Sequence, residues 1–311
     1  MTTAPDAAAP LRVAVVGARR THQGTGPFLA LQAAAAGAAV CAVWGTSSES
    51  AEEASRWLSE RGLDSPGFAD WNRLLVQARP EALIVAGPRD THAAWLETGL
   101  RARLHVLCEK PLTARRDPAE LARDFAAAGR VLRENCQWPF TLDAFLNMHP
   151  GFSLERASRF RMRMTPAHSG RDRWMELLSH PLSLLQAAAP GPVELEGVRF
   201  HDAGRLSFRW RTHNCELDCQ VDAVPSDEYP RPAEYRFDQA LLRRRIEQPG
   251  YRFAFEDQAG RVQPGADPMA LSVADFLGRV ALARARCAAP LDEDLVRRQE
   301  LFDRILAAWP A

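Results

Sequence analysis

The first 137 residues alternate short apolar runs with amphipathic stretches, and this alternation limits the possible folds more than any other feature. Five runs have the two-faced apolar character of strands in a buried parallel sheet. They occupy 12–17, 39–44, 82–87, 104–109 and 130–135. Helix candidates lie between them at 27–36, 50–61, 70–78, 90–101 and 117–128. The pattern predicts a doubly wound α/β domain, whose ligands bind at the carboxyl ends of the strands.

Start signals support these helices. Ser50 and Glu53 have the spacing of a capping box, and Asp70 precedes the third helix. Asp117 stands before a proline suited to a first helical turn.

The pattern changes after Trp138. A helical segment at 172–187 precedes alternating runs at 197–204, 205–224 and 251–257, with proline and glycine turn signals between them. Two helices at 268–285 and 292–308 end the sequence. We expect two domains, 1–137 and 138–311, the second an α+β domain with a largely antiparallel sheet.

The composition excludes several kinds of partner. Net charge is zero and charges of both signs are interspersed, so we expect neither nucleic acid nor an anionic membrane surface as a partner. The first residues resemble no signal peptide and no long apolar run follows, so we expect a cytoplasmic protein with a small-molecule substrate. Six cysteines suit a reduced core. The close pair Cys215 and Cys219 lacks further ligands at metal spacing, so we expect no metal site.

Lys110 is the only lysine of the chain, so 38 of its 39 basic residues are arginine. An arginine-rich chain that keeps one lysine suggests a specific need for an ammonium, which exchanges a proton more readily than a guanidinium does. Chance retention of one lysine is the alternative.

Three motifs occur in a fixed order along the chain. "PRDTHAAWLETGLRARLHVLCEKPL" (88–112) has a P-x-x-x-H turn, a helix and then a strand ending in EKP. "RDRWMELLSHPLSLL" (171–185) and "DPMALSVADFLGRV" (267–280) follow. In sequence and order these motifs resemble the Gfo/Idh/MocA oxidoreductase family.

The resemblance implies a nicotinamide-binding Rossmann domain, then a domain whose open, mostly antiparallel sheet often forms a homodimer or homotetramer interface. It implies a sugar-like substrate between the domains, Lys110 beside the nicotinamide, and His180 as the proton donor or acceptor. Glu176 stands where the family usually has Asp. Because it is four residues before His180, we expect both on one helix face, with Glu176 orienting the catalytic pair.

The glycine loop departs from the family. Its G-x-G-x-x-G is replaced by a longer loop from Gly17 through Gly24 to Gly26, with a helix expected from Pro27. We expect these glycines, with Arg19 and Arg20, to bind cofactor phosphates. A loop that has lost the cofactor is the alternative.

The end of the second strand bears on the cofactor. NAD sites usually place an acidic residue there, whereas this chain has Trp44-Gly45-Thr46-Ser47. Hydroxyls of Thr46 and Ser47, with an arginine nearby, favour NADP(H) over NAD(H). The alternative is that the serines only cap the next helix. From the motifs we also place Pro88, His92 and Glu109 on the cofactor side.

Two features have weaker functional meaning. Arg159, Arg161 and Arg163 alternate and so share one strand face, which is more typical of a solvated face than of an anion site. Trp138 at the domain junction suits a cleft wall or a core equally well.

The sequence thus predicts an NADP-dependent oxidoreductase that transfers a hydride to or from a carbonyl, alcohol or imine carbon. A non-catalytic sensor on the same fold, or a lyase or hydrolase that oxidises its substrate transiently, are the alternatives.

Overall fold

The computed structural model describes residues 9–19, 24–113, 116–202, 204–247 and 252–310. Its contacts divide the chain into two compact units. Unit 1 comprises Met1–Asn135 and Ser272–Asp292, and unit 2 comprises Cys136–Leu271 and Glu293–Ala311. The units therefore exchange chain at three points, and the contiguous division at 137/138 stays a prediction. Within the described ranges, no helix is both long and apolar enough to cross a membrane.

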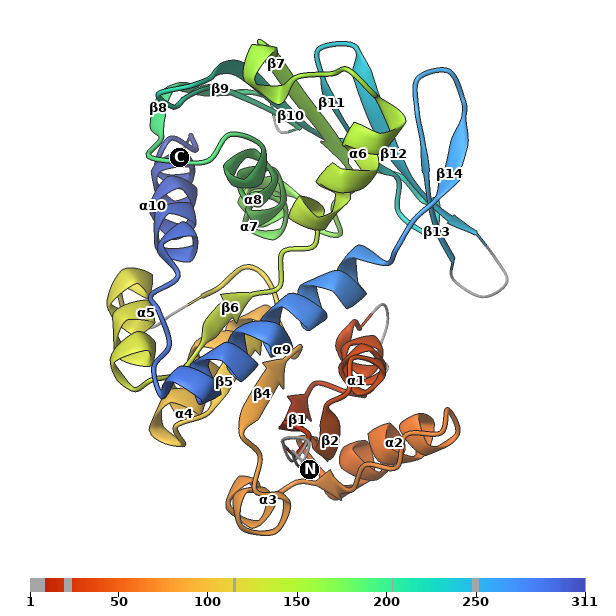
Figure 1. Cartoon of the computed structure of the whole chain (residues 1–311), viewed down its shortest axis with the longest axis vertical. Helices are drawn as coiled ribbons and strands as arrows, with labels where there is room; N and C mark the ends of the chain where they lie inside the picture. The colour runs from red at the N-terminus through yellow and green to blue at the C-terminus, as the bar shows by residue number, and fades with distance from the viewer. Residues whose placement is uncertain (1–8, 20–23, 114–115, 203, 248–251, 311) are drawn as a thin grey trace, which may run out of the picture. The chain divides into compact units, whose positions relative to one another are not determined.

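A sheet of parallel strands forms the centre of unit 1, in the order β3-β2-β1-β4-β5-β6 (Figure 1). The strands are β1 Arg12–Val16, β2 Ala39–Trp44, β3 Gly67–Phe68, β4 Ala82–Val85, β5 His105–Cys108 and β6 Leu132–Glu134. Every residue of β4 and β5 is buried, as the apolar runs predicted. The strand order reverses between β1 and β4, where doubly wound sheets bind their ligands. The predicted α/β fold is confirmed.

Unit 1 also contains helices, and all but the last of them lie between consecutive strands of this sheet. They are α1 Gly26–Ala35, α2 Ser48–Ser59, α3 Trp71–Ala78, α4 His92–Arg101, α5 Pro118–Ala127 and α9 Pro268–Arg286, whose first residues belong to unit 2, with the short η1 Arg89–Thr91 before α4. Asp70 and Asp117 cap α3 and α5 as predicted. The capping box expected of Ser50 and Glu53 is wrong, because Ser47 caps α2 and Ser50 is its partner.

An eight-stranded sheet forms unit 2, in the order β14-β13-β12-β11-β7-β10-β9-β8. Among the described residues of this sheet, only β7 and β10 pair in parallel, so the prediction of a mostly antiparallel sheet is confirmed. The strands are β7 Arg159–Met164, β8 Glu194–Asp202, β9 Arg205–Arg211, β10 Glu216–Ala223, β11 Ala233–Phe237, β12 Ala240–Glu247, β13 Arg252–Glu256 and β14 Val262–Pro264. The run at 205–224 is a hairpin of two strands.

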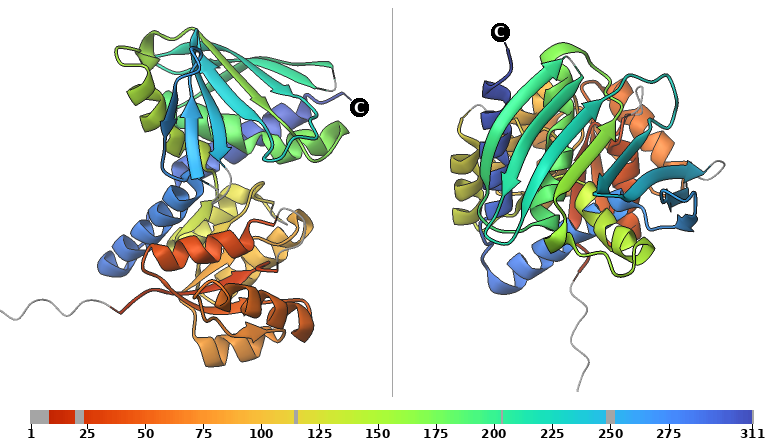
Figure 2. Two further views of the ribbon diagram at one scale, coloured as in Figure 1. Left: turned by 90° about the vertical axis from the view of Figure 1, so that its right-hand side faces the viewer. Right: turned by 90° about the horizontal axis from the view of Figure 1, so that it is seen from above.

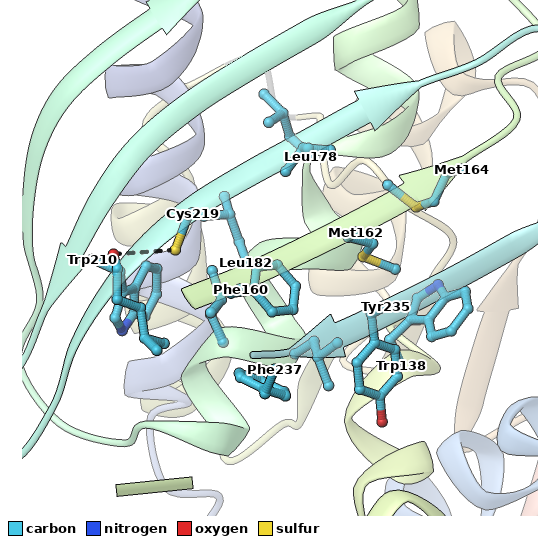
Figure 3. Packing of buried hydrophobic residues seen from close by; sticks show 14 of the residues in the cluster. Trp138, Phe160, Met162, Met164, Leu178, Leu182, Trp210, Cys219, Tyr235 and Phe237 are labelled. Atoms are coloured by element: carbon cyan, nitrogen blue, oxygen red, sulfur yellow. Dashed lines mark hydrogen bonds between the residues drawn. The ribbon is translucent and has the colours of Figure 1, made fainter. Parts of the chain in front are cut away.

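Helices cover one face of this sheet (Figure 2). They are η2 Trp138–Thr141, α6 Leu142–Met148, η3 Leu154–Arg156, α7 Gly170–Leu177, α8 Ser179–Ala188 and α10 Glu293–Ala307. Phe160, Met162 and Tyr235 of the sheet pack there with Trp138 and Leu182 (Figure 3). This apolar layer is the core of unit 2.

The opposite face of the sheet carries charge. Arg159, Arg161 and Arg163 alternate with buried residues along β7, so the prediction that they share one face is confirmed. Along one row of cross-strand neighbours, Arg163 lies between Asp222 and Glu234. Alternating charges across strands stabilise a solvated face.

The helix expected over 172–187 is two helices. Pro181 has no N–H to donate to the Leu177 carbonyl, and α7 ends at Leu177. Glu176 therefore belongs to α7 and His180 to α8, and the expectation that both lie on one helix is wrong.

Candidate active site

The turn after β1 brings three backbone segments together. Gly17 has a φ of +84°, and a Cβ there would lie 2.6 Å from the Ala86 carbonyl carbon and the Gly87 nitrogen, which follow β4. A Cβ on Gly26 would overlap the Gly17 carbonyl oxygen. Glycine at both positions therefore leaves an open backbone cradle at the point where the strand order reverses.

Helix α1 begins at this cradle without a side-chain cap. Its N-cap residue is Thr25, whose side chain makes no capping hydrogen bond, and the helix starts at Gly26, one residue before the expected Pro27. Backbone N–H groups of a first turn bind anions well. Gly24 lies directly before this turn, while Arg20 lies outside the described residues. The cradle and the helix start together suit a dinucleotide pyrophosphate.

The end of β2 has no room for a side chain at Gly45. A Cβ there would lie 2.5 Å from the Ser50 Oγ and 2.6 Å from the Ala51 nitrogen. Thr46 and Ser47 are exposed, and the Ser47 Oγ accepts a hydrogen bond of 3.2 Å from the Ser50 N–H. Ser47 thus caps α2, which was the alternative to a cofactor role, while its hydroxyl proton remains available for a second bond.

Arg19 leaves the β1 turn toward α2. Its Nε lies 2.7 Å from the Glu53 carboxylate, and the two side chains are 49% and 48% exposed. Ion pairs this exposed contribute little to stability, so a stronger anion can displace Glu53 from Arg19.

His92 joins the ends of two strands. Its ring is buried, with Nε2 3.0 Å from the Gly87 carbonyl oxygen and Nδ1 3.1 Å from the Pro111 carbonyl oxygen. The ring therefore links the segment after β4 to the segment after β5. Pro88 lies between these contacts, and its carbonyl accepts the Thr91 hydroxyl at 2.7 Å. The structure gives His92 a structural contact, and its cofactor role stays a prediction.

Lys110 follows β5 and precedes a cis peptide bond to Pro111. The neighbours of Lys110 are fixed by buried side chains of β6 and the residue after it. The Asn135 amide donates to the Glu109 carboxylate at 2.5 Å, and the buried Glu134 carboxylate accepts the Leu112 N–H at 3.0 Å. The turn that carries the sole lysine is thus held on both sides.

His180 lies on the helix-covered face of unit 2. It is 9% exposed, and its ring centroid lies 6.4 Å from that of the buried Trp138. The Arg244 guanidinium carbon lies 5.9 Å from the Trp138 ring centroid, within the range of cation–π attraction. A histidine, an indole and a guanidinium therefore line one region of this unit.

Glu176 contacts a different set of groups. Its carboxylate accepts the Ala167 N–H at 2.8 Å and lies 3.0 Å from the His168 Nδ1 and 3.2 Å from the Arg231 Nη1. Arg231 and Arg244 both line a cavity of about 1120 Å³ in unit 2. Glu176 therefore anchors one arginine of this cavity, and its predicted role in orienting His180 stays a prediction.

Residues 11–135 match the family model described as an oxidoreductase family with an NAD-binding Rossmann fold, named Gfo/Idh/MocA. The first segment of unit 1 therefore matches the Gfo/Idh/MocA oxidoreductase family. The match covers the first segment of unit 1 and includes the cradle and the lysine turn.

Known proteins resemble this chain to different extents. D-xylose 1-dehydrogenase (NADP(+)) 2 of Haloferax volcanii is 33% identical over 88 residues, which are 28% of this chain and 27% of that protein. The fold matches a 3-ketoreductase of Actinomadura kijaniata in complex with NADP. That match has a TM-score of 0.67 and 22% identity, and it covers 96% of this chain and 97% of the other. The fold also matches an inositol dehydrogenase homologue of Azotobacter vinelandii, complexed with NADH and myo-inositol. That match has a TM-score of 0.66 and 19% identity, and it covers 97% of this chain and 96% of the other.

The structure adds site residues that the sequence motifs did not identify. Asn135 bonds Glu109, and Ser272 of α9 donates to the Asn135 amide oxygen at 2.7 Å. The signal was present in the sequence, because Glu134 and Asn135 are polar residues at the end of an apolar strand. Nothing in the sequence pairs Asn135 with a serine 137 positions later.

Proposed function

We propose that this chain is a Gfo/Idh/MocA oxidoreductase that transfers a hydride between NADP(H) and a carbonyl, alcohol or imine carbon of a small sugar-like molecule. The observation that carries the proposal is the position of the sole lysine. Lys110 follows β5 at the carboxyl edge of the Rossmann sheet, in a turn fixed by Asn135, Glu134 and His92. Such a fixed position suits a residue that must meet a reacting atom.

The glycine cradle provides the cofactor site in this proposal. The Gly17, Gly24 and Gly26 backbones and the first turn of α1 would hold the pyrophosphate. When bound, the nicotinamide supplies or accepts the hydride. The chain's own residues then bind the substrate, exclude water and move the proton.

NADP(H) is the preferred cofactor in the proposal, because Gly45 leaves no place for the carboxylate that selects NAD. Thr46, Ser47 and Arg19 would bind the 2′-phosphate, with Arg19 exchanging its exposed Glu53 partner for the stronger anion. The ketoreductase is complexed with NADP and the inositol dehydrogenase homologue with NADH. Since the fold accepts both cofactors, the preference rests on this chain's own residues.

The proton in the proposed reaction is managed by two residues. His180 would donate it to, or accept it from, the substrate oxygen, because imidazole exchanges protons near neutral pH. Lys110 would polarise the same oxygen, and Glu176 would support this arrangement through Arg231. Trp138 beside His180, and Arg244 beside Trp138, would offer an apolar face and a cation to the substrate. The relatives' names point to sugars and cyclic polyols as the class to screen.

The test is a titration of the folded protein, freed of retained nucleotide, with NADPH and with NADH. Nicotinamide fluorescence gives the two dissociation constants. In parallel, protein grown with ¹³C-lysine gives one lysine signal, which reports whether the cofactor reaches Lys110. Binding of NADPH that also moves this signal supports the proposal and justifies a screen of keto-sugars, aldehydes and imines.

Other outcomes favour the alternatives. If neither nucleotide binds, the oxidoreductase proposal fails and a ligand sensor becomes the better explanation. If a substrate is converted with no net change in nicotinamide absorbance, the reaction belongs to the lyase or hydrolase class.

We also propose that the protein is cytoplasmic and forms a homodimer or homotetramer. Light scattering during size-exclusion chromatography tests the assembly, and a monomer at all concentrations contradicts it.

A further inference from the structure

Three residues mark the points where the chain leaves or enters unit 1. They are Asn135, Ser272 and Asp292. The Ser272 hydroxyl bonds the Asn135 amide, and the Asp292 carboxylate bonds the Arg133 guanidinium. At each of the three points where the chain passes between the units, the boundary residue of unit 1 is therefore bonded within unit 1, at or next to the end of β6.

Asn135 has a second bond that leads to the lysine turn. Its amide nitrogen donates to the Glu109 carboxylate, and its amide oxygen accepts from the Ser272 hydroxyl. A carboxylate only accepts, so Glu109 fixes the orientation of the amide. Asn135 and Ser272 are 4% and 5% exposed, and a buried polar group that loses its partner destabilises its surroundings. The side chains of Glu109, Asn135 and Ser272 therefore form one hydrogen-bond network.

The next residue makes the corresponding contact in unit 2. The Cys136 thiol donates to the Ser179 carbonyl oxygen, 3.8 Å away, and Ser179 precedes His180. Asn135 thus bonds Glu109, the residue before Lys110, within unit 1. The next residue, Cys136, bonds Ser179, the residue before His180, within unit 2.

From this arrangement we propose that Asn135 is a positioning residue, which fixes the Glu109–Pro111 turn relative to the point where the chain leaves unit 1, and that Ser272 holds Asn135 in its active orientation. The role of Lys110 in this inference rests on the proposed function. The placement of the lysine turn does not, and it is measured without cofactor or substrate.

Two variants break the network with little change in volume. Asn135→Asp replaces the donor by a second carboxylate next to Glu109, which repels it. Ser272→Ala removes only the donor to the amide oxygen, and Ser272→Thr keeps the hydroxyl. Arg133→Gln is the matched control. Arg133 lies in β6, two residues before Asn135, and its ion pairs with Asp275 and Asp292 hold another boundary between the units.

The readout is the single Lys110 ε-carbon signal of ¹³C-lysine-labelled protein, with circular dichroism to verify folding. We expect Asn135→Asp and Ser272→Ala to move this signal by more than its line width. We expect Ser272→Thr to restore it, and Arg133→Gln to lower the melting temperature but leave the signal in place.

Two results overturn the inference. One is an unmoved Lys110 signal in both network variants. The other is an equal movement in Arg133→Gln, which would mean that any loosening at the boundaries between the units disturbs the turn. Failure of NADPH to bind in the separate titration would instead remove the proposed function and leave the positioning result intact.

Discussion

Lys110 shows how residue type and position combine. The sequence singled it out by its rarity, and the fold places it after β5 in a turn held by side chains of α4, β6 and the residue after β6. Rarity is visible in a sequence, whereas the bonds that fix the turn are not, because their partners are 19 to 26 residues away. The same limit explains why Ser272 was missed.

Replacing Lys110 by arginine keeps the charge and removes the proton-exchanging group. We expect turnover to fall by about 100-fold or more, the usual size of a lost acid–base contribution. NADPH affinity should change by less than about threefold, since the glycine cradle is intact. NADPH oxidation with a substrate from the screen measures turnover, and the nicotinamide fluorescence titration measures NADPH affinity. Turnover within threefold of the wild type would refute a catalytic role for the ammonium.

His105 gives the protein a pH-dependent stability. Burial, followed by the charges of Arg130 and Arg284, lowers its pKa from 6.5 to about 4. The unfolded chain therefore binds a proton that the folded chain does not. The contribution of His105 to the free energy of unfolding is fully present above about pH 6.5. It is lost as the pH decreases toward 4, and the loss is at most about 3 kcal/mol.

Urea unfolding at pH 7.5, 6 and 5 measures this loss. In His105→Asn, the amide oxygen can still accept the Val131 N–H that His105 Nδ1 accepts at 3.0 Å, but nothing titrates. We expect a smaller loss of stability between pH 7.5 and 5 in this variant. The same loss in both proteins would assign the effect to other groups.

At the scale of elements, periodicity identified most of unit 1 because its strands are continuous apolar runs. It missed β3, whose two residues are too short to show a period. In unit 2 periodicity missed the break between α7 and α8 at Leu178. The apolar pattern continues through Pro181, whereas the missing N–H of this proline ends α7. The sequence prediction also placed the start of α2 at Ser50, since two serines satisfy the same cap rule.

The contact between the β1 turn and α2 determines the expected cofactor preference. Arg19→Ala should weaken NADPH binding by roughly fivefold, which corresponds to about 1 kcal/mol for an exposed charge pair. NADH binding should change by less than about twofold, because NADH has no 2′-phosphate for Arg19 to contact. Glu53→Gln should strengthen NADPH binding, because it frees the guanidinium. Parallel titrations with both nucleotides decide, and equal effects on NADH would show that Arg19 does not contact the 2′-phosphate.

At the scale of the whole molecule, unit 1 is built from two separate segments. The segment Ser272–Asp292 provides Val273, Phe276 and Val280, all with no exposed surface, and the two carboxylates bound to Arg133. The sequence predicted the helix at 268–285 but assigned it to the second domain. Periodicity finds a helix without showing which core its apolar face contacts.

A chain of residues 1–135 alone should therefore be much less stable than the same chain joined by a flexible linker to 272–292. Loss of three buried apolar side chains corresponds to about 5 kcal/mol or more. Thermal unfolding of the two proteins tests this difference. Equal melting temperatures would show that unit 1 does not need its second segment.

The discontinuity of unit 1 also affects the order of events during synthesis. Its first segment leaves the ribosome long before Ser272, because all of 136–271 must be translated in between. At roughly 5–20 residues per second this takes on the order of ten seconds. During that interval Asn135 and Arg133 lack their partners Ser272 and Asp292, so the Rossmann unit of the nascent chain stays incomplete while the sheet of unit 2 is made.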